Sequence, residues 1–325
     1  FSIKLIATII FILAIVNILY YFGIMQKVVQ FFAKIMYKIM NVSGAEALSN
    51  IASVFVGQVE AQIMIRPYLK TATKSELLAS MTGSMACIAG GVMAIYIAMG
   101  VPAEFLLAAS IMAAPGALAV AKIIYPEDEE SQTKDEVKVI VERTHVNLID
   151  SIANAASDGM KVSLNVIAML IALLSLIAMA DWCLAKIGLF LFDYCHIQLS
   201  FIDLSNLSLK SLLGAIFSLF AFIMGVPLEN VVQVGALMGE KLVLNEFIAY
   251  TDLIQMKELL TPKAITIASI ALCGFANFGS IAIQIGGIGE LAPTRRGDIA
   301  KLGIKALIAG TFASYISACM AGILM

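Results

Sequence analysis

The chain has 325 residues, of which 61% are hydrophobic and 14% charged, and its formal net charge is −2. A soluble domain carries about 25% charged residues, so this composition excludes an ordinary soluble protein and indicates a chain that crosses a membrane several times. The small net charge gives no sign of a nucleic-acid partner. The five scattered cysteines show no CxxC or Cys–His spacing, so no metal site is predicted from them.

The first third of the chain alternates apolar and basic segments. A spanning helix needs about 20 apolar residues, and the uncharged stretch 5–25 satisfies this length. Residues 26–42 carry three lysines spaced among aromatic and aliphatic residues, a pattern typical of an amphipathic helix that lies in the membrane interface. Residues 77–103, which are uncharged but broken by glycines, and residues 105–121 are predicted to be two further spans.

The remainder begins with the polar segment 126–143, which is predicted to be a solvated loop. Residues 145–161 are predicted to be a second interfacial helix, and residues 163–180 a plain span. Three more apolar segments follow, at 211–228, at 264–289 with a break around Gly274–Gly279, and at 306–325.

Basic residues indicate which side of the membrane each connection occupies. Three clusters are placed in the cytoplasm by the positive-inside rule: Lys27, Lys34 and Lys38; Arg66, Lys70 and Lys74; and Arg295, Arg296, Lys301 and Lys305. The apolar segment 43–73 therefore begins and ends on the cytoplasmic side, and it is predicted to be a re-entrant hairpin interrupted at Gly57. By the same reasoning, residues 211–250 form a second hairpin that enters from the opposite face.

The two hairpins carry matching features. Glu60 in the first and Glu246 in the second are 186 positions apart, and so are Gly91 and Asn277 in the broken spans that follow. Each half is therefore predicted to consist of an acidic hairpin, an interrupted helix and a closing helix. If the hairpins enter from opposite faces, the halves form an inverted repeat, which is typical of secondary transporters.

Acids in such apolar surroundings need a physical reason. Placing an ionised carboxylate at the centre of a spanning helix costs about 2.5–3.5 kcal/mol even on lenient scales, so such acids usually face a cavity. Irregular backbone at that depth is tolerated only where it is buried in protein or lines water. We therefore expect Gln58, Glu60 and Glu246 to line one pocket for a polar solute.

Five stretches are specific enough to indicate a family. They are VFVGQVEAQ (54–62), ACIAGGVMAIYI (86–97), LLAASIMAAPGALAVAKIIYPE (106–127), KLVLNEFIAY (241–250) and CGFANFGSIAIQIGGIGELAPTRRGDIAKLGIKAL (273–307). Over nearly the whole chain they resemble the concentrative nucleoside transporter family. The resemblance implies an all-α polytopic membrane protein, a homotrimer in the lipid bilayer, and an elevator-type mechanism. Bacterial members have eight spans, and this chain is expected to lack the first two.

In the elevator scheme a transport domain that holds both hairpins slides against a scaffold. The resemblance therefore implies four parts: 1–42, a scaffold helix plus an interfacial helix; 43–125, transport-domain repeat 1; 126–210, a cytoplasmic loop, an interfacial helix and a scaffold helix; and 211–325, transport-domain repeat 2.

The resemblance also implies the substrate contacts. Those expected to face the nucleobase are Gln58, Val59, Glu60 and Val92; those expected to face the ribose hydroxyls are Glu246, Asn277 and Ser280; Phe275 would form an apolar wall. The chemistry is sensible, because ribose hydroxyls can donate to a carboxylate and pair with an amide and a hydroxyl. Val59 stands where the family usually has threonine or serine, so one hydroxyl contact to the base is expected to be missing.

The coupling-ion site implied by the family falls on Ser53, Val56, Cys87 and Ile88. Sodium prefers hard oxygen ligands, whereas a cysteine sulfur is soft. Ser53 supplies one oxygen and the Cys87 side chain supplies none. Two alternatives remain: a proton carried by Glu60 or Glu246, or sodium held by carbonyl groups and water.

The implied function is a nucleoside:cation symporter of the cell (inner or plasma) membrane that concentrates nucleosides such as uridine, driven by H+ or Na+. No organic cofactor, nucleic acid or metal beyond sodium is expected. The alternative is a nucleoside-permeable channel, or a non-transporting gate or receptor protein of the same fold. The sequence contains no HExxH, GxGD or Ser/Lys arrangement, so an intramembrane enzyme is not expected.

Overall fold

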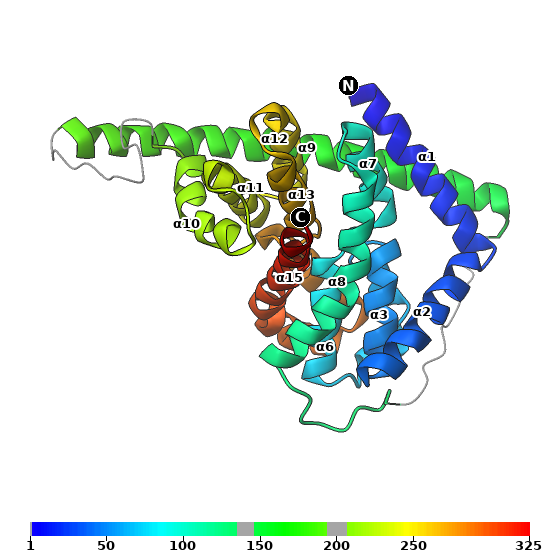
Figure 1. The fold of residues 1–325 in the computed structure, drawn as a ribbon. Coiled ribbons are helices and arrows are strands. Elements are labelled where there is room, and N and C mark those ends of the chain that lie inside the picture. The colour runs from blue at the N-terminus through cyan, green and yellow to red at the C-terminus, as the bar shows by residue number, and fades with distance from the viewer. Residues whose placement is uncertain (1, 135–145, 194–206) are drawn as a thin grey trace.

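The computed structural model describes residues 2–134, 146–193 and 207–325. Within these ranges it is a bundle of helices without strands (Figure 1), as the all-α prediction requires. Four helices in this part of the chain are long and apolar enough to cross a membrane, and a fifth is added if one bent pair counts as a single span. The chain is therefore a multi-pass membrane protein.

The bent pair comprises α1 (Ser2–Tyr21) and α2 (Ile24–Met40), whose axes meet at 80°. Gly23 connects them with φ of +70°, a left-handed conformation that glycine adopts without steric cost. Val29 and Ala33 on α2 are buried, while Phe31 and Ile39 are exposed. The bend separates two helices close to the predicted boundary at residue 25, while their placement across and along the membrane stays a prediction.

The first predicted hairpin and its broken span are both present. The helical hairpin is interrupted between residues 56 and 59, and the following span is interrupted between residues 87 and 89. The helices are α3 (Gly44–Phe55), the short α4 (Glu60–Ile63) and α5 (Arg66–Leu69), α6 (Lys74–Ala86), α7 (Gly90–Met99) and the closing α8 (Ala103–Ile124).

The segment after the polar loop differs from the prediction. Instead of an interfacial helix and a separate span, the structure has one helix, α9 (Leu148–Asp193), of 46 residues. At 1.5 Å per residue it is about 69 Å long, more than twice the hydrocarbon thickness of a bilayer. The sequence between 148 and 193 contains no proline, so nothing in it interrupts the helical hydrogen bonds. Figure 1 shows α9 running along one side of the molecule, with α1 against it. His145, part of the predicted interfacial helix, lies outside the described residues.

In the second half, the helix α10 (Leu209–Ile223) precedes the hairpin and is not part of it. The turn at Gly225–Pro227 separates α10 from α11, so the acidic hairpin is formed by α11 and α12 and is shorter than the predicted 211–250 segment. Gly235 of α11 allows α10 to approach closely, because a Cβ on Gly235 would lie 2.9 Å from the Gly214 carbonyl oxygen of α10. The α-helices are α10 (Leu209–Ile223), α11 (Val231–Val243), α12 (Glu246–Gln255), α13 (Pro262–Ala271), α14 (Phe278–Leu291) and α15 (Arg296–Leu324); 3₁₀ turns lie at Leu228–Asn230, Lys257–Leu259 and Pro293–Arg295.

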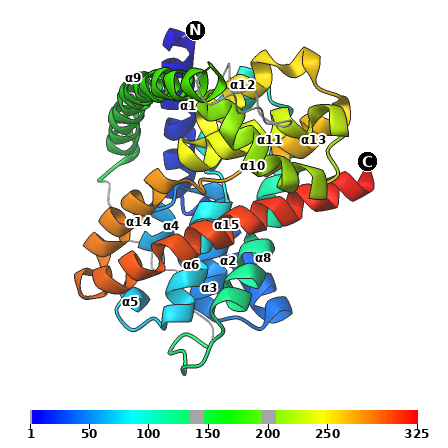
Figure 2. The same cartoon turned by 90° about the vertical axis from the view of Figure 1, so that its left-hand side faces the viewer.

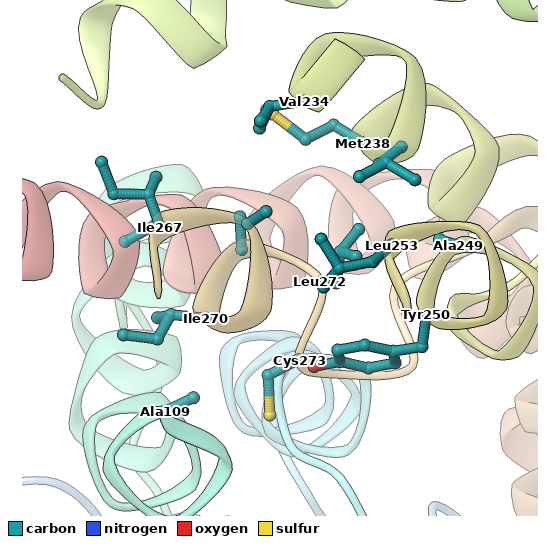
Figure 3. Close-up of a cluster of buried hydrophobic side chains, with 14 of the residues drawn as sticks. Ala109, Val234, Met238, Ala249, Tyr250, Leu253, Ile267, Ile270, Leu272 and Cys273 are labelled. Atoms are coloured by element: carbon teal, nitrogen blue, oxygen red, sulfur yellow. The ribbon is translucent and has the colours of Figure 1, made fainter. Parts of the chain in front are cut away.

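The closing helix α15 connects the halves. It crosses the molecule in contact with α6, α8, α13 and α14 (Figure 2). Small residues allow these close approaches, as is common between membrane helices: a Cβ on Gly310 would lie 2.8 Å from the Met85 Cβ. Further along α15, Tyr315 and Ala318 belong to the apolar cluster whose Tyr250, Leu253 and Ile267 are shown in Figure 3.

The break between α6 and α7 lies against the break between α13 and α14. Gly274, in the break between α13 and α14, has φ of +112°. A Cβ on this residue would collide with the carbonyl oxygen of Ala86, at the end of α6. Both halves therefore bring their irregular backbone to one place in the interior. The two halves share the same order of elements, while their relation by an inverted axis and the four-part division into scaffold and transport domain stay predictions.

The polar segment after α8 is not simply a solvated loop. Ser131 and Thr133 both donate hydrogen bonds to the Glu76 carboxylate near the start of α6, and Thr133 is only 4% exposed. The Thr133 carbonyl accepts a 2.7 Å hydrogen bond from the Gly44 backbone N–H. The first part of the loop is therefore bound to the starts of α3 and α6.

Candidate functional site

A chain of hydrogen bonds joins the tip of the first hairpin to the second hairpin. The Gln58 side-chain amide donates to Ser280 Oγ over 3.1 Å, and the Ser280 backbone N–H donates to Asn277 Oδ1 over 2.9 Å. The Asn277 side-chain amide then donates to Glu246 Oε2 over 3.2 Å. Four of the predicted substrate-binding residues, one from each hairpin and two from the second broken helix, are thus connected.

Local sequence explains why these side chains meet. Asn277 is the N-cap of α14, so its side-chain oxygen Oδ1 accepts a hydrogen bond from the backbone N–H of Ser280. Glu246 is the first residue of α12, whose N-cap is Asn245. Helix N-termini present free N–H groups and the positive end of the helix dipole, which favours a carboxylate there. The site therefore consists of two helix beginnings that face each other.

Tyr96 completes the surroundings of Glu246. Its hydroxyl donates to Glu246 Oε1 over 3.1 Å, so each carboxylate oxygen has one donor. The Tyr96 ring stacks on Tyr250 at a centroid distance of 4.6 Å, and Tyr96 is 1% exposed. Sequence reasoning missed this residue. The available signal was its position one helical turn after Val92, on the same face of α7.

One polar atom of the site is unsatisfied within the part of the chain that the structure describes. The Gln58 Oε1 atom is buried and accepts no hydrogen bond from the described residues. Val92 and Phe275 are half-buried and pack against the apolar cluster that contains Tyr96 and Phe247. A polar molecule at this place would meet an open amide acceptor, a buried carboxylate and an apolar wall. The roles given to these residues remain predictions.

Two residues of the first hairpin behave differently. Glu60 lies outside the hydrogen-bond chain: its side chain is exposed, folds back over Gly57 and interacts electrostatically with Tyr20 of α1. A pocket shared by both acids therefore stays a prediction. Val59 packs its methyl groups against the backbone of Gly287 on α14, so closely that a Cβ there would collide with them.

The residues of the predicted coupling-ion site lie around the ends of α3 and α6. The Ser53 hydroxyl donates to the Ser49 carbonyl over 2.8 Å and lies 3.1 Å from Ser84 Oγ. Ser84 also accepts a 2.8 Å hydrogen bond from the Gln62 side chain. Ser53 thus belongs to a buried network of hydroxyl and amide groups. The other predicted residues, Val56, Cys87 and Ile88, are also buried.

The fold and the site define a class: a polytopic α-helical transporter whose predicted binding residues lie at a hairpin tip, at the start of a hairpin helix and in a broken helix. Two family descriptions match the chain, "Nucleoside recognition" over residues 2–103 and "Na+ dependent nucleoside transporter C-terminus" over residues 105–322. The second covers more than half of the chain. The chain belongs to the concentrative nucleoside transporter family, whose members are transporters and not enzymes.

Characterised and uncharacterised relatives agree with this placement. The chain is 42% identical over 324 residues to the uncharacterized transporter YutK of Bacillus subtilis, covering 99% of this chain and 77% of YutK. It is 37% identical to nucleoside permease NupC of Helicobacter pylori, covering 99% of this chain and 75% of NupC. Sodium/nucleoside cotransporter 1 of Mus musculus is 38% identical, with 100% of this chain but only 51% of the mouse protein covered.

The fold itself is also known in a solved structure. CNTnw in an inward-facing substrate-bound state superimposes with a TM-score of 0.89 at 38% sequence identity, covering 99% of this chain and 74% of CNTnw. The predicted fold class, a helical membrane transporter with interrupted helices, is confirmed.

Proposed function

We propose that this protein is a nucleoside:cation symporter that concentrates nucleosides across the cell membrane. The observation that carries the proposal is the chain of hydrogen bonds from Gln58 through Ser280 and Asn277 to Glu246. It joins both halves of the molecule at one site and contains an open acceptor at one end and a carboxylate at the other. The names of its relatives, which include sodium/nucleoside cotransporters and a nucleoside permease, support the same substrate class.

The proposed orientation places the ribose at Glu246 and Asn277. The two vicinal hydroxyls of the sugar can donate to a carboxylate and accept from an amide. The nucleobase then lies toward Gln58, whose free Oε1 can accept a base N–H group, with Val92 and Phe275 as apolar neighbours. Removing a ribose hydroxyl would leave a buried group unpaired, at a cost of about 1–3 kcal/mol.

We propose a proton as the coupling cation, with Glu60 as its carrier. The carboxylate of Glu60 is exposed at the hairpin tip, whereas Glu246 is buried and has a donor on each oxygen. The Ser53 hydroxyl is already bonded within a network of serines, and the side chain at position 87 is a thiol, which is a poor sodium ligand.

Movement is proposed to follow the elevator scheme in a homotrimer, with both hairpins carried by one transport domain. The long helix α9 and α1, which contact each other, would belong to the scaffold. The electrostatic interaction between Glu60 and Tyr20 of α1 would then act between the moving and the fixed part, where the charge of Glu60 can influence the movement.

Uptake of labelled uridine into proteoliposomes tests the function. An inward proton gradient without sodium should drive accumulation above equilibrium, and an inward sodium gradient at equal pH should not. Accumulation with sodium alone would contradict the proton proposal, equilibration without accumulation would indicate a channel, and binding without uptake would indicate a receptor.

Two variants separate the coupling step from substrate binding. Glu60→Gln should lose proton-driven accumulation and keep exchange of internal for external uridine, because exchange needs no net proton movement. The double variant Ser53→Asn with Cys87→Ser, which restores oxygen and amide ligands, should gain sodium-driven uptake. Proton-driven accumulation by Glu60→Gln at the unaltered rate would exclude Glu60 as the carrier.

A further inference from the structure

Lys241 is a buried lysine to which the proposed transport scheme assigns no role. It lies on α11, shortly before the tip of the second hairpin, and is 2% exposed. Its Nζ atom lies 2.9 Å from the Ala271 carbonyl oxygen, 3.2 Å from the Cys273 carbonyl oxygen and 3.4 Å from Ser314 Oγ. An ammonium group has three N–H donors, which these three oxygens match.

Ser314 supports this arrangement. Its hydroxyl donates to the Cys273 carbonyl over 2.9 Å, so its lone pairs remain available to the ammonium. A neutral amine has only two N–H groups and could not donate to all three oxygens. The oxygen cage around Lys241 is therefore suited to a cation.

The position of the cage explains why a cation is needed. Ala271 is the last residue of α13, and Cys273 lies in the break between α13 and α14 (Figure 3). The last carbonyls of a helix have no intrahelical partners and carry the negative end of its dipole. The Lys241 ammonium neutralises this end inside the protein, and it also interacts electrostatically with the Glu246 carboxylate.

The first half has a corresponding place. Cys273 follows Cys87 by 186 positions, and Lys241 follows Phe55 by the same interval. The end of α3 at Phe55 lies against the start of α7, because a Cβ on Gly90 would be 3.3 Å from the Phe55 carbonyl oxygen. This place in the first half contains the residues of the predicted coupling-ion site.

We propose that the Lys241 ammonium is a tethered cation that occupies, in the second half, the place that corresponds to the predicted coupling-ion site of the first. The proposal rests on the cation symport proposed above. As a consequence the two halves differ: the break next to Glu246 and Asn277 always contains its cation, so its binding conformation does not depend on the ion gradient. Only the first half then responds to the ion gradient.

The test removes the tethered cation and returns it from solution. Lys241→Ala lacks the three methylene groups and the nitrogen that n-propylammonium can supply. In a buffer whose only cation is the bulky N-methylglucammonium, the purified variant should melt roughly 5–10 °C below the unaltered protein, since it leaves a buried polar cage without its partner. Added n-propylammonium at constant ionic strength should reverse most of this shift, and 1-propanol should not.

Lys241→Met is the matched control, because it fills the space without charge. It should melt lower than the unaltered protein and should not respond to n-propylammonium. Melting of Lys241→Ala at the unaltered temperature, equal rescue by 1-propanol, or an equal response of Lys241→Met would overturn the proposal. If Lys241→Ala cannot be purified, Lys241→Met as stable as the unaltered protein would overturn it. Melting requires no transport, so failure of the symport proposal would be seen separately, in the uptake assay.

Discussion

Replacing Glu246 by glutamine tests the ribose-binding role most directly. The change removes the charge and keeps the size of the side chain. The start of α12 should remain intact, because the N-cap bond runs from the Ile248 N–H to the Asn245 side chain and does not involve Glu246. The loss expected is therefore one of ligand binding and not of folding.

The magnitude follows from the contacts of the carboxylate. Hydrogen bonds to a charged group contribute about 1.5–3 kcal/mol and those between neutral groups about 0.5–1.5 kcal/mol, so each ribose hydroxyl that donates to Glu246 should lose about 1–1.5 kcal/mol. Two hydroxyls then give about 2–3 kcal/mol, or roughly a 30- to 140-fold weaker affinity for uridine. In Glu246→Gln the side-chain oxygen can still accept from the Asn277 amide, whereas the NH2 group would donate to the Tyr96 hydroxyl, which would change from donor to acceptor.

The assay is calorimetric binding of uridine, 2′-deoxyuridine and 3′-deoxyuridine to purified protein. The unaltered protein should prefer uridine, and Glu246→Gln should bind the three with similar, weak affinity. Glu240→Gln is the matched control, since Glu240 is a buried acid on the same hairpin that pairs with Lys210 at 3.3 Å. Retained affinity together with retained preference for uridine in Glu246→Gln would refute the ribose assignment.

Three further changes test other parts of the site. Tyr96→Phe should weaken uridine binding by roughly 10-fold, because Glu246 loses one hydrogen-bond donor. Tyr250→Phe is the control: among the contacts described, the Tyr250 hydroxyl bonds only to a backbone carbonyl, so this change should affect melting and not affinity. Equal losses of affinity in the two variants would contradict a role of the Tyr96 hydroxyl in positioning Glu246. Gly274→Ala should prevent accumulation of folded protein in the membrane, because a Cβ would strike the Ala86 carbonyl oxygen and the φ angle of Gly274 is +112°. A normal yield and melting temperature would show that the two helix breaks are farther apart. Val59→Thr should lower the melting temperature by roughly 2–4 °C, because threonine has the shape of valine but places a hydroxyl in the apolar contact with α14. An unchanged melting temperature would show that the hydroxyl finds a hydrogen-bond partner there.

Much of the architecture followed from local features of the sequence. Uninterrupted apolar length predicts spans, and lysine and arginine clusters predict their orientation. Glycines in apolar segments predict breaks, and the structure confirms those near Gly57, Gly90 and Gly274. These properties depend only on neighbouring residues, so a single sequence is sufficient to find them.

The long helix α9 shows where this reasoning failed. A change from amphipathic to apolar composition near residue 162 was interpreted as a boundary between two helices, but composition alone does not end a helix. Without a proline to interrupt them, the backbone hydrogen bonds continue from Leu148 to Asp193, past Gly159 and Ser163. The docked start of the polar loop was missed because its partner, Glu76, lies 55 residues before Ser131.

The sequence by itself determined a multi-pass helical protein with one acid at each of two hairpins, because the cost of polar groups in a membrane leaves a strong local pattern. Only the tertiary structure decided what those acids contact. Tyr96 reaches Glu246 across 150 positions, and Lys241 reaches the end of α13 across 30. Such contacts depend on how helices pack, and packing leaves no periodic signal in one chain.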